Sequence, residues 1–152
     1  MKQSTYYLDT NIFLYAADVD SPYHKDCRNI IIHADTSTGQ DPYYIVTSTE
    51  VIQEIVHVSQ RLGLHEKGLK IAALALKHCQ ECIAIDLDVV AIYLQLMKKH
   101  PTAMSRDIIQ VAVCLNQGIQ KIITCDKDFD TFKELQILTP GKAVDEIYSQ
   151  LK

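Results

Sequence analysis

Short runs of β-branched and aromatic residues alternate with segments of helical apolar spacing along the whole chain. The short runs predict strands at 5–8, 43–47, 82–85, 121–124 and 135–138. Helical spacing and capping signals predict helices at 12–17, 22–34, 48–58, 64–80, 88–100, 105–117, 128–133 and 142–151. This alternation is typical of a parallel sheet covered by helices. We therefore expect a single α/β domain over residues 1–152, with a central, mostly parallel sheet of four to five strands.

Turn-forming and capping residues predict where several of these elements begin and end. Ser21 is expected to cap the second helix with Pro22 at its first position, because proline is well suited to a helix N-terminus. Pro101 is expected to end the helix at 88–100, and Gly118 is expected to end the helix at 105–117. The segment 18–40 matches no motif, so its role stays open.

Composition argues against a membrane span, a secreted protein and a disulfide framework. The longest apolar run, at 71–76, is far shorter than the roughly 20 residues that a membrane span needs. The first residues lead straight into a strand without an apolar signal core, so a cytoplasmic protein is expected. Five cysteines, an odd number, fit reduced thiols better than a disulfide framework. Cys79 and Cys82 form a CxxC without a second ligand pair, so buried thiols are expected rather than a zinc site.

Four acidic residues stand at or near the predicted carboxyl ends of strands, where α/β sheets collect their ligand chemistry. Asp9 ends the first strand, and Asp126 lies two residues past the fourth. Glu54 is in the second turn of the helix after the second strand, and Asp107 is in the first turn of the helix before the fourth. Gathered carboxylates would repel one another and raise their pKa values unless a cation lay among them. An all-oxygen set suits Mg²⁺ or Mn²⁺, which activate water for phosphoryl displacement.

Each acid also has an ordinary structural interpretation. Asp9 and Asp107 are suitable helix caps, Asp126 is a suitable turn residue, and Glu54 is an acceptable exposed helical acid. Glu50, four residues before Glu54 on the same helix face, competes for its role. The joint placement of four acids at strand ends favours the functional interpretation.

The same residues argue against two other kinds of site, an EF-hand calcium loop and a phosphatase active site. An EF-hand loop starting at Asp126 would need glycine where Thr131 stands and glutamate where Ile137 stands, which excludes it. A phosphatase with Asp9 as covalent nucleophile would want a second aspartate where Asn11 stands, which disfavours it.

Four segments carry a resemblance to a known family: YLDTN at 7–11, TSTEVIQEI at 47–55, SRDIIQVA at 105–112 and ITCDKDF at 123–129. In this order and spacing they resemble a PIN-domain nuclease, most of all the VapC-type toxins, over residues 6 to about 140. The resemblance implies a PIN-like fold and metal-dependent hydrolysis of RNA, with Mg²⁺ or Mn²⁺ as cofactor. It also implies a small protein antitoxin as a candidate partner, and a homodimer as a candidate assembly.

Carried onto this sequence, the resemblance makes Asp9, Glu54, Asp107 and Asp126 the metal ligands and catalytic acids, with Asp128 as an extra metal ligand or a supporting acid. The late segment offers Asp126, Asp128 and Asp130, and the choice of Asp126 rests on its match to the family pattern. Thr10, Asn11 and Thr124 would orient ligands or water by hydrogen bonds. Phosphate contacts are expected, more weakly, from Arg106, Lys127, Lys98 and Lys99, with His100 beside them.

The net charge of −4 does not discriminate between nucleic-acid and other substrates. Without the four proposed ligands, acidic and basic residues would balance at 15 each, so the excess charge fits within one pocket. The main alternative is a PIN-like module that binds RNA or a partner without turnover. The complete set of four acids favours the nuclease.

Overall fold

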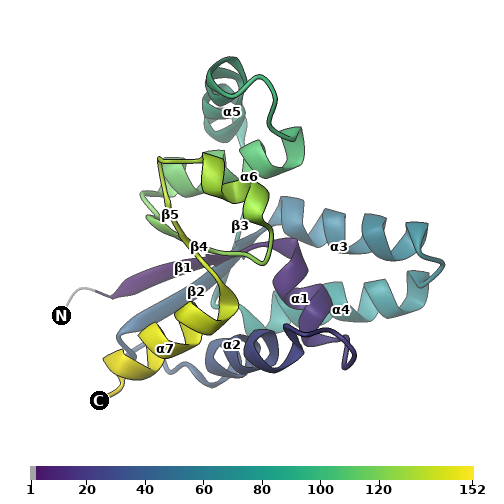
Figure 1. Cartoon of the computed structure of the whole chain (residues 1–152), viewed down its shortest axis with the longest axis vertical. Helices are drawn as coiled ribbons and strands as arrows, with labels where there is room; N and C mark the ends of the chain where they lie inside the picture. The colour runs from purple at the N-terminus through teal and green to yellow at the C-terminus, as the bar shows by residue number, and fades with distance from the viewer. Residues whose placement is uncertain (1–2) are drawn as a thin grey trace.

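The computed structural model describes residues 3–152, which form an α/β fold around a five-stranded sheet (Figure 1). Its strands are β1 (Ser4–Leu8), β2 (Tyr43–Ser48), β3 (Glu81–Ile83), β4 (Lys121–Ile123) and β5 (Gln136–Leu138), in the spatial order β3-β2-β1-β4-β5. Each pair of neighbouring strands in these residues is parallel. The expected α/β class and parallel sheet are confirmed, and β1 lies at the centre of the sheet.

The helices of the described residues are α1 (Thr10–Ala16), α2 (His24–Thr36), α3 (Thr49–Arg61), α4 (His65–His78), α5 (Leu87–Lys99), α6 (Ser105–Gln117), the 3-10 helix η1 (Lys127–Thr131) and α7 (Pro140–Gln150). Helices α5 and α6 cover one face of the sheet, while α1, α2 and α7 cover the other (Figure 1). This division follows from right-handed crossovers, because the chain moves one way from β1 to β3 and the opposite way from β3 to β4.

The central strand is buried from both sides. Tyr6, Tyr7 and Leu8 of β1 are each fully buried, which is usual for a parallel strand covered by helices on both faces. The Tyr7 hydroxyl is hydrogen-bonded to the Ser48 hydroxyl at 2.6 Å, so its polar end is satisfied inside the core. The same burial continues to Asp9, whose side chain is only 4% exposed.

The start of α2 differs from the prediction. Ser21 does not cap the helix: its Oγ accepts a hydrogen bond from the Tyr23 N–H at 3.2 Å, and its carbonyl accepts one from the His24 N–H at 3.1 Å. Ser21 and Pro22 therefore form a turn, and the helix begins only at His24. A serine–proline pair stabilises either arrangement locally, and packing of α2 against α1 and α7 selects this one. The segment 18–40, whose role was open, supplies this turn and the whole of α2.

Other boundaries move by a few residues. The strand predicted at 82–85 is β3, and the helix predicted at 128–133 is η1, a single 3-10 segment. Gly118 closes α6 with a φ of +68°, as predicted, because glycine adopts the left-handed conformation without a steric penalty.

Two expectations from composition can be compared with the fold. None of the helices formed by residues 3–152 is long and apolar enough to span a bilayer. All five cysteines are free thiols; Cys79 is buried at the end of α4, while Cys82 in β3 is half-buried.

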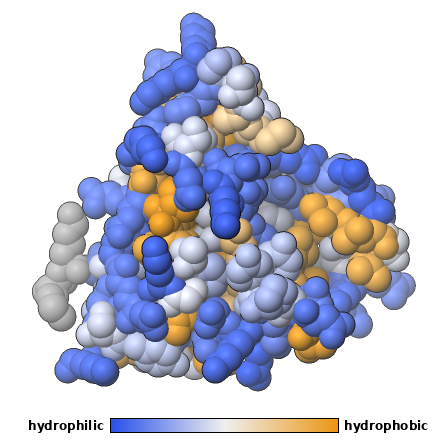
Figure 2. Space-filling model, in the orientation of Figure 1, coloured by the Kyte–Doolittle hydropathy of each residue, from blue (hydrophilic) through white to orange (hydrophobic). Residues whose placement is uncertain are grey.

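Figure 2 shows exposed apolar side chains at the outer end of the α3–α4 hairpin, where Leu62 is 69% exposed.

Helices α3 and α4 approach closely at Gly68, so we predict that Gly68→Ala destabilises the fold. A Cβ at this position would lie 2.3 Å from the Ser59 Cβ, and Ser59 is itself buried. The expected loss is about 1–3 kcal/mol in the free energy of unfolding, because overpacking outweighs alanine's better helix propensity. Urea denaturation measures it. Adding Ser59→Gly should restore part of the loss, and an unchanged or higher stability of Gly68→Ala would contradict the prediction.

Candidate active site

Asp9 lies where the central strand ends and α1 begins. It is the N-cap of α1, and its Oδ1 accepts a hydrogen bond from the Thr10 N–H at 2.7 Å. Its Oδ2 accepts a second hydrogen bond from the Thr124 hydroxyl at 2.7 Å. Thr124 follows β4 directly, and the pairing of Leu8 with Ile123 brings the two strand ends together. The ordinary interpretation of Asp9 as a cap is therefore correct but incomplete, since Thr124 holds the same carboxylate from another strand.

Glu54 of α3 is connected to the same strand end. The Thr10 hydroxyl donates to Glu54 Oε2 at 2.7 Å, so one threonine contacts Asp9 through its backbone and Glu54 through its side chain. Glu54 also raises the pKa of both Asp9 and Asp107, although in each case burial contributes more. Glu50, the competitor one turn earlier, is near both Glu54 and Arg106. Burial raises the pKa of Glu50, Glu54 raises it further, and Arg106 partly opposes this rise. The hydrogen bond from Thr10 therefore favours Glu54.

Asp107 occupies the first turn of α6 but does not cap it, because the N-cap residue is Met104. Its side chain is half-buried. Burial is the main cause that raises the pKa of Asp107 to about 7, followed by the charges of Asp9, Asp126, Glu54 and Asp128. Each predicted acid thus acts electrostatically on Asp107.

The loop after β4 supplies the remaining acids and is held by Asn11. The Asn11 Oδ1 accepts from the Cys125 N–H at 3.2 Å, and its Nδ2 donates to the Thr124 hydroxyl at 3.4 Å. Asp126 is half-buried and caps η1 by accepting from the Asp128 N–H at 2.9 Å, whereas Asp128 is exposed. The three predicted supporting residues, Thr10, Asn11 and Thr124, therefore all hydrogen-bond within this site.

Burial makes the deepest carboxylate difficult to ionise. Desolvation raises the pKa of Asp9 to about 6, although hydrogen bonds from Thr124 and Thr10 and the nearby Gln110 amide lower it. Carboxyl groups with raised pKa values beside other acids are a known mark of functional sites. A cation among them would offset both the desolvation and the mutual repulsion.

The donor set fits a hard divalent cation. Asp9, Glu54, Asp107 and Asp126 offer carboxylate oxygens alone, the chemistry that Mg²⁺ and Mn²⁺ prefer over zinc. As the side chains stand, no three Asp, Glu, His or Cys groups within residues 3–152 converge tightly enough to hold an ion. Repulsion between carboxylates acts against such convergence, and half-buried Glu54, Asp107 and Asp126 can rotate more freely than Asp9.

Basic residues lie beside the acids, but several are paired with acidic neighbours. Lys99 Nζ lies 2.7 Å and His100 Nε2 lies 2.9 Å from the same Glu134 Oε1. A hollow of about 720 Å³ next to Asp107 is lined by these two residues and by Lys127. Arg106 is half-buried near Glu50, and Lys98 is exposed on α5. Of the predicted phosphate-binding residues, Lys99 and Lys127 thus share the hollow, whereas Arg106 lies beside the competing acid.

Sequence reasoning missed Gln110. This residue of α6 is fully buried, and its amide lies near Asp9. Within residues 3–152, neither its Oε1 nor its Nε2 has a hydrogen-bond partner. A signal was available in the sequence, because Gln110 is a single amide in an apolar helix segment, one turn after Asp107.

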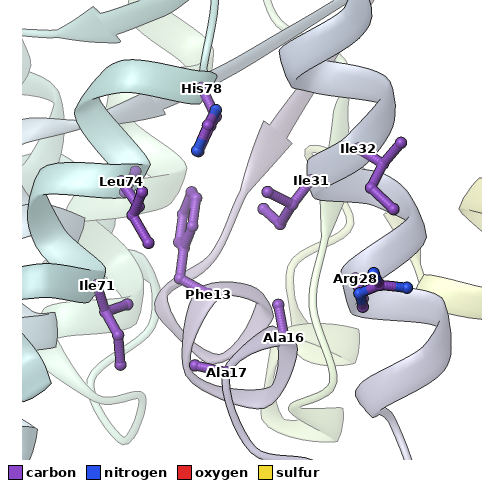
Figure 3. Close-up of a pocket in the computed structure, with 10 residues that line it drawn as sticks. Phe13, Ala16, Ala17, Arg28, Ile31, Ile32, Ile71, Leu74 and His78 are labelled. Atoms are coloured by element: carbon purple, nitrogen blue, oxygen red, sulfur yellow. The ribbon is translucent and has the colours of Figure 1, made fainter.

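A second, apolar groove of about 270 Å³ lies between α1, α2 and α4. Figure 3 shows Phe13 of α1 between Leu74 and Ile31, with His78 at one end and Arg28 on the outer side of α2. The side chain of Leu74 is 50% exposed, and His78 Nδ1 lies 2.5 Å from Asp35 Oδ1. The groove is thus apolar along its length, with basic groups at its edges.

The family model described as "PIN domain" matches residues 6–135, which is most of the chain. The chain belongs to the PIN domain family. The resemblance drawn from the four sequence segments is thereby confirmed.

Relatives of this PIN domain include ribonuclease VapC23 of Mycobacterium tuberculosis, 29% identical over 120 residues that cover 79% of this chain and 91% of that protein. Among solved structures, VapBC2 from Rickettsia felis bound to a DNA fragment from its promoter matches with a TM-score of 0.67 and 16% identity, covering 89% of this chain and 98% of that one. Mycobacterium tuberculosis VapC20, a sarcin-ricin loop cleaving toxin, also matches with a TM-score of 0.67, at 19% identity, covering 86% of this chain and 98% of that one. At these identities the two structures show the shared fold.

For this PIN domain, we predict that Asp107→Asn stabilises the metal-free protein at neutral pH. An unfolded aspartate has a pKa of about 3.9, so a folded-state pKa of about 7 makes the fold lose stability as the pH rises between these values. The amide should remove this loss and add about 1–2 kcal/mol at about pH 7.5, a value reduced because water screens a half-buried group.

Urea denaturation in EDTA, at about pH 5 and about pH 7.5, measures the effect. The gain should be largest at the higher pH and clearly smaller at the lower one, which lies nearer to the pKa of an unfolded aspartate. Asp130→Asn, at an exposed position of η1, is the charge-matched control. Equal stability of the wild type and Asp107→Asn at both pH values would contradict the predicted electrostatic cost.

Proposed function

We propose that this PIN domain is a metal-dependent endoribonuclease and the toxin of a toxin–antitoxin pair. The observation that carries the proposal is that Asp9, Glu54 and Asp126, which come from separate segments of the chain, all act electrostatically on half-buried Asp107. Relatives that bear the name ribonuclease VapC support the RNA substrate. Cytoplasmic location is part of the same proposal, because an RNA substrate would be met there.

The four acids would hold Mg²⁺ or Mn²⁺, with Asp128 as an additional acid at the exposed rim. When bound, such an ion activates water and neutralises charge on the phosphodiester. The remaining chemistry belongs to the chain. Thr124 and the Thr10 N–H fix the two oxygens of Asp9, and the Thr10 hydroxyl fixes Glu54, so two ligands are oriented before an ion arrives.

RNA would approach along the hollow beside Asp107. Lys99 and Lys127 line it and place positive charge near the acids, which suits a phosphate backbone. Glu134 holds Lys99 and His100 in place and also reduces their free charge, so we expect them to guide the backbone rather than to bind it tightly. Arg106 and Lys98 would contribute from its surroundings.

We predict that Asp9→Asn abolishes metal-dependent cleavage of single-stranded RNA. The amide removes the buried carboxylate charge but keeps the size; its Oδ1 can still accept from the Thr10 N–H while its Nδ2 donates to the Thr124 hydroxyl, so the fold should survive. Cleavage should fall by more than about 100-fold, and EDTA should abolish that of the wild type. The assay uses an RNA panel with Mg²⁺, Mn²⁺ or EDTA, with circular dichroism as the check on folding.

Asp130→Asn is the control for this assay and should retain activity, because its exposed side chain lies outside the acid set. Cleavage by a well-folded Asp9→Asn at the wild-type rate would eliminate the proposed site. A wild type that binds RNA without cleaving it would favour the alternative of a non-catalytic PIN-like module.

The antitoxin would occupy the groove between α1, α2 and α4. Its apolar walls suit the apolar face of a partner helix, and Arg28 at its edge suits an acidic side chain on that helix. The likeness to structures of VapBC complexes supports a protein partner. A homodimer stays a prediction, for which the exposed apolar end of the α3–α4 hairpin is a suitable surface.

We predict that Leu74→Glu weakens binding of a candidate antitoxin by about 10-fold or more without affecting RNA cleavage. A charge in the groove would be buried by the partner without compensation. Leu69→Glu on the same helix is the matched control. Leu69 and Leu74 are similarly exposed, at 48% and 50%, but only Leu74 lines the groove of Figure 3. Isothermal titration of the purified pair measures binding. An equal loss for both variants would place the partner elsewhere.

A further inference from the structure

Gln110 is a buried amide that the structure of α6 does not require. Its side chain is 0% exposed, and within residues 3–152 neither polar atom has a hydrogen-bond partner. The residues that follow it, Val111 to Cys114, are all buried, so an apolar side chain would fill this position without the cost of an unpaired amide. A polar side chain kept here at the expense of stability indicates a role outside packing.

The location of Gln110 identifies that role. It follows Asp107 by three residues and therefore lies on the same face of α6, one turn deeper in the core. Its amide is also near enough to the Asp9 carboxylate to favour its charge, together with Thr124 and the Thr10 N–H, but it makes no well-formed hydrogen bond to that carboxylate. One helix thus brings an acid and an amide to the same buried carboxylate.

We propose that Gln110 is a positioning residue of the metal site, whose amide donates to Asp9 and fixes the carboxylate for the incoming ion. This inference rests on the proposed function, because it assumes that Asp9 binds the metal. Thr10 and Thr124 each contribute one donor, and Gln110 adds a third from the opposite layer of the fold, on the helix that carries Asp107. Without an ion the amide remains imperfectly paired, and metal binding completes its hydrogen bond.

The decisive variant is Gln110→Met, which keeps the length of the side chain and removes both polar atoms. In EDTA its melting temperature should equal or exceed that of the wild type, because no well-formed hydrogen bond is lost. Its dissociation constant for Mn²⁺, measured by isothermal titration, should rise by about 10- to 100-fold, as for other residues that orient metal ligands. On RNA, kcat should fall by a similar factor with KM nearly unchanged.

Two further variants separate positioning from packing. Gln110→His retains an N–H donor and should recover part of the Mn²⁺ affinity that methionine loses. Gln117→Met removes an exposed glutamine at the end of the same helix and should leave both stability and Mn²⁺ affinity unchanged.

The outcomes distinguish this inference from the proposed function. A wild type that binds no Mn²⁺ and cleaves no RNA would overturn both. A wild type that binds Mn²⁺, with Gln110→Met binding equally well, would overturn the role of Gln110 alone. A marked loss of stability of Gln110→Met in EDTA would also overturn it, because the amide would then be structural.

Discussion

The Asp9 carboxylate is buried at the end of the central strand, and the rest of the site is arranged around the need to hold it there. A buried charge without partners would be prohibitively costly, so its two oxygens are bonded by the Thr10 N–H and by the Thr124 hydroxyl. These donors come from the helix after β1 and from the end of β4, which meet only because the two strands pair in parallel. Thr10 then extends the same arrangement to Glu54. The position of one carboxylate therefore links two strands and two helices of the fold.

The same site opposes folding in the absence of a cation. Burial raises the pKa of Asp9, and burial with neighbouring acids raises that of Asp107, so ionising them at neutral pH costs stability. The unpaired, buried amide of Gln110 adds to this cost. Sites that bind a charged ligand commonly carry such costs, since the ligand compensates them. A large apolar core around β1 tolerates the unfavourable groups.

Helix α1 connects the two surfaces to which we assign function. Its first residues, Thr10 and Asn11, hold the acidic site, and Phe13 and Ala16 of the following turns line the apolar groove. The helix is only seven residues long, so both surfaces depend on the same short element. Segment 18–40, which matches no sequence motif, completes the groove by placing α2 beside α1. The least recognisable part of the sequence thus forms one wall of the proposed partner site.

Local patterns in the sequence determined the order of strands and helices, the left-handed end of α6 at Gly118, and the placement of acids at strand ends. These features depend on neighbouring residues or on the general geometry of parallel sheets, so one sequence contains them. Tertiary structure alone decided the choices that depend on distant contacts. The hydrogen bond from Thr10 favours Glu54 over Glu50, and Glu134 occupies Lys99 and His100, which the charge pattern presented as free. The start of α2 at His24 rather than Ser21, and the place of Gln110 against Asp9, likewise follow from packing between elements far apart in the chain, which local propensity does not encode.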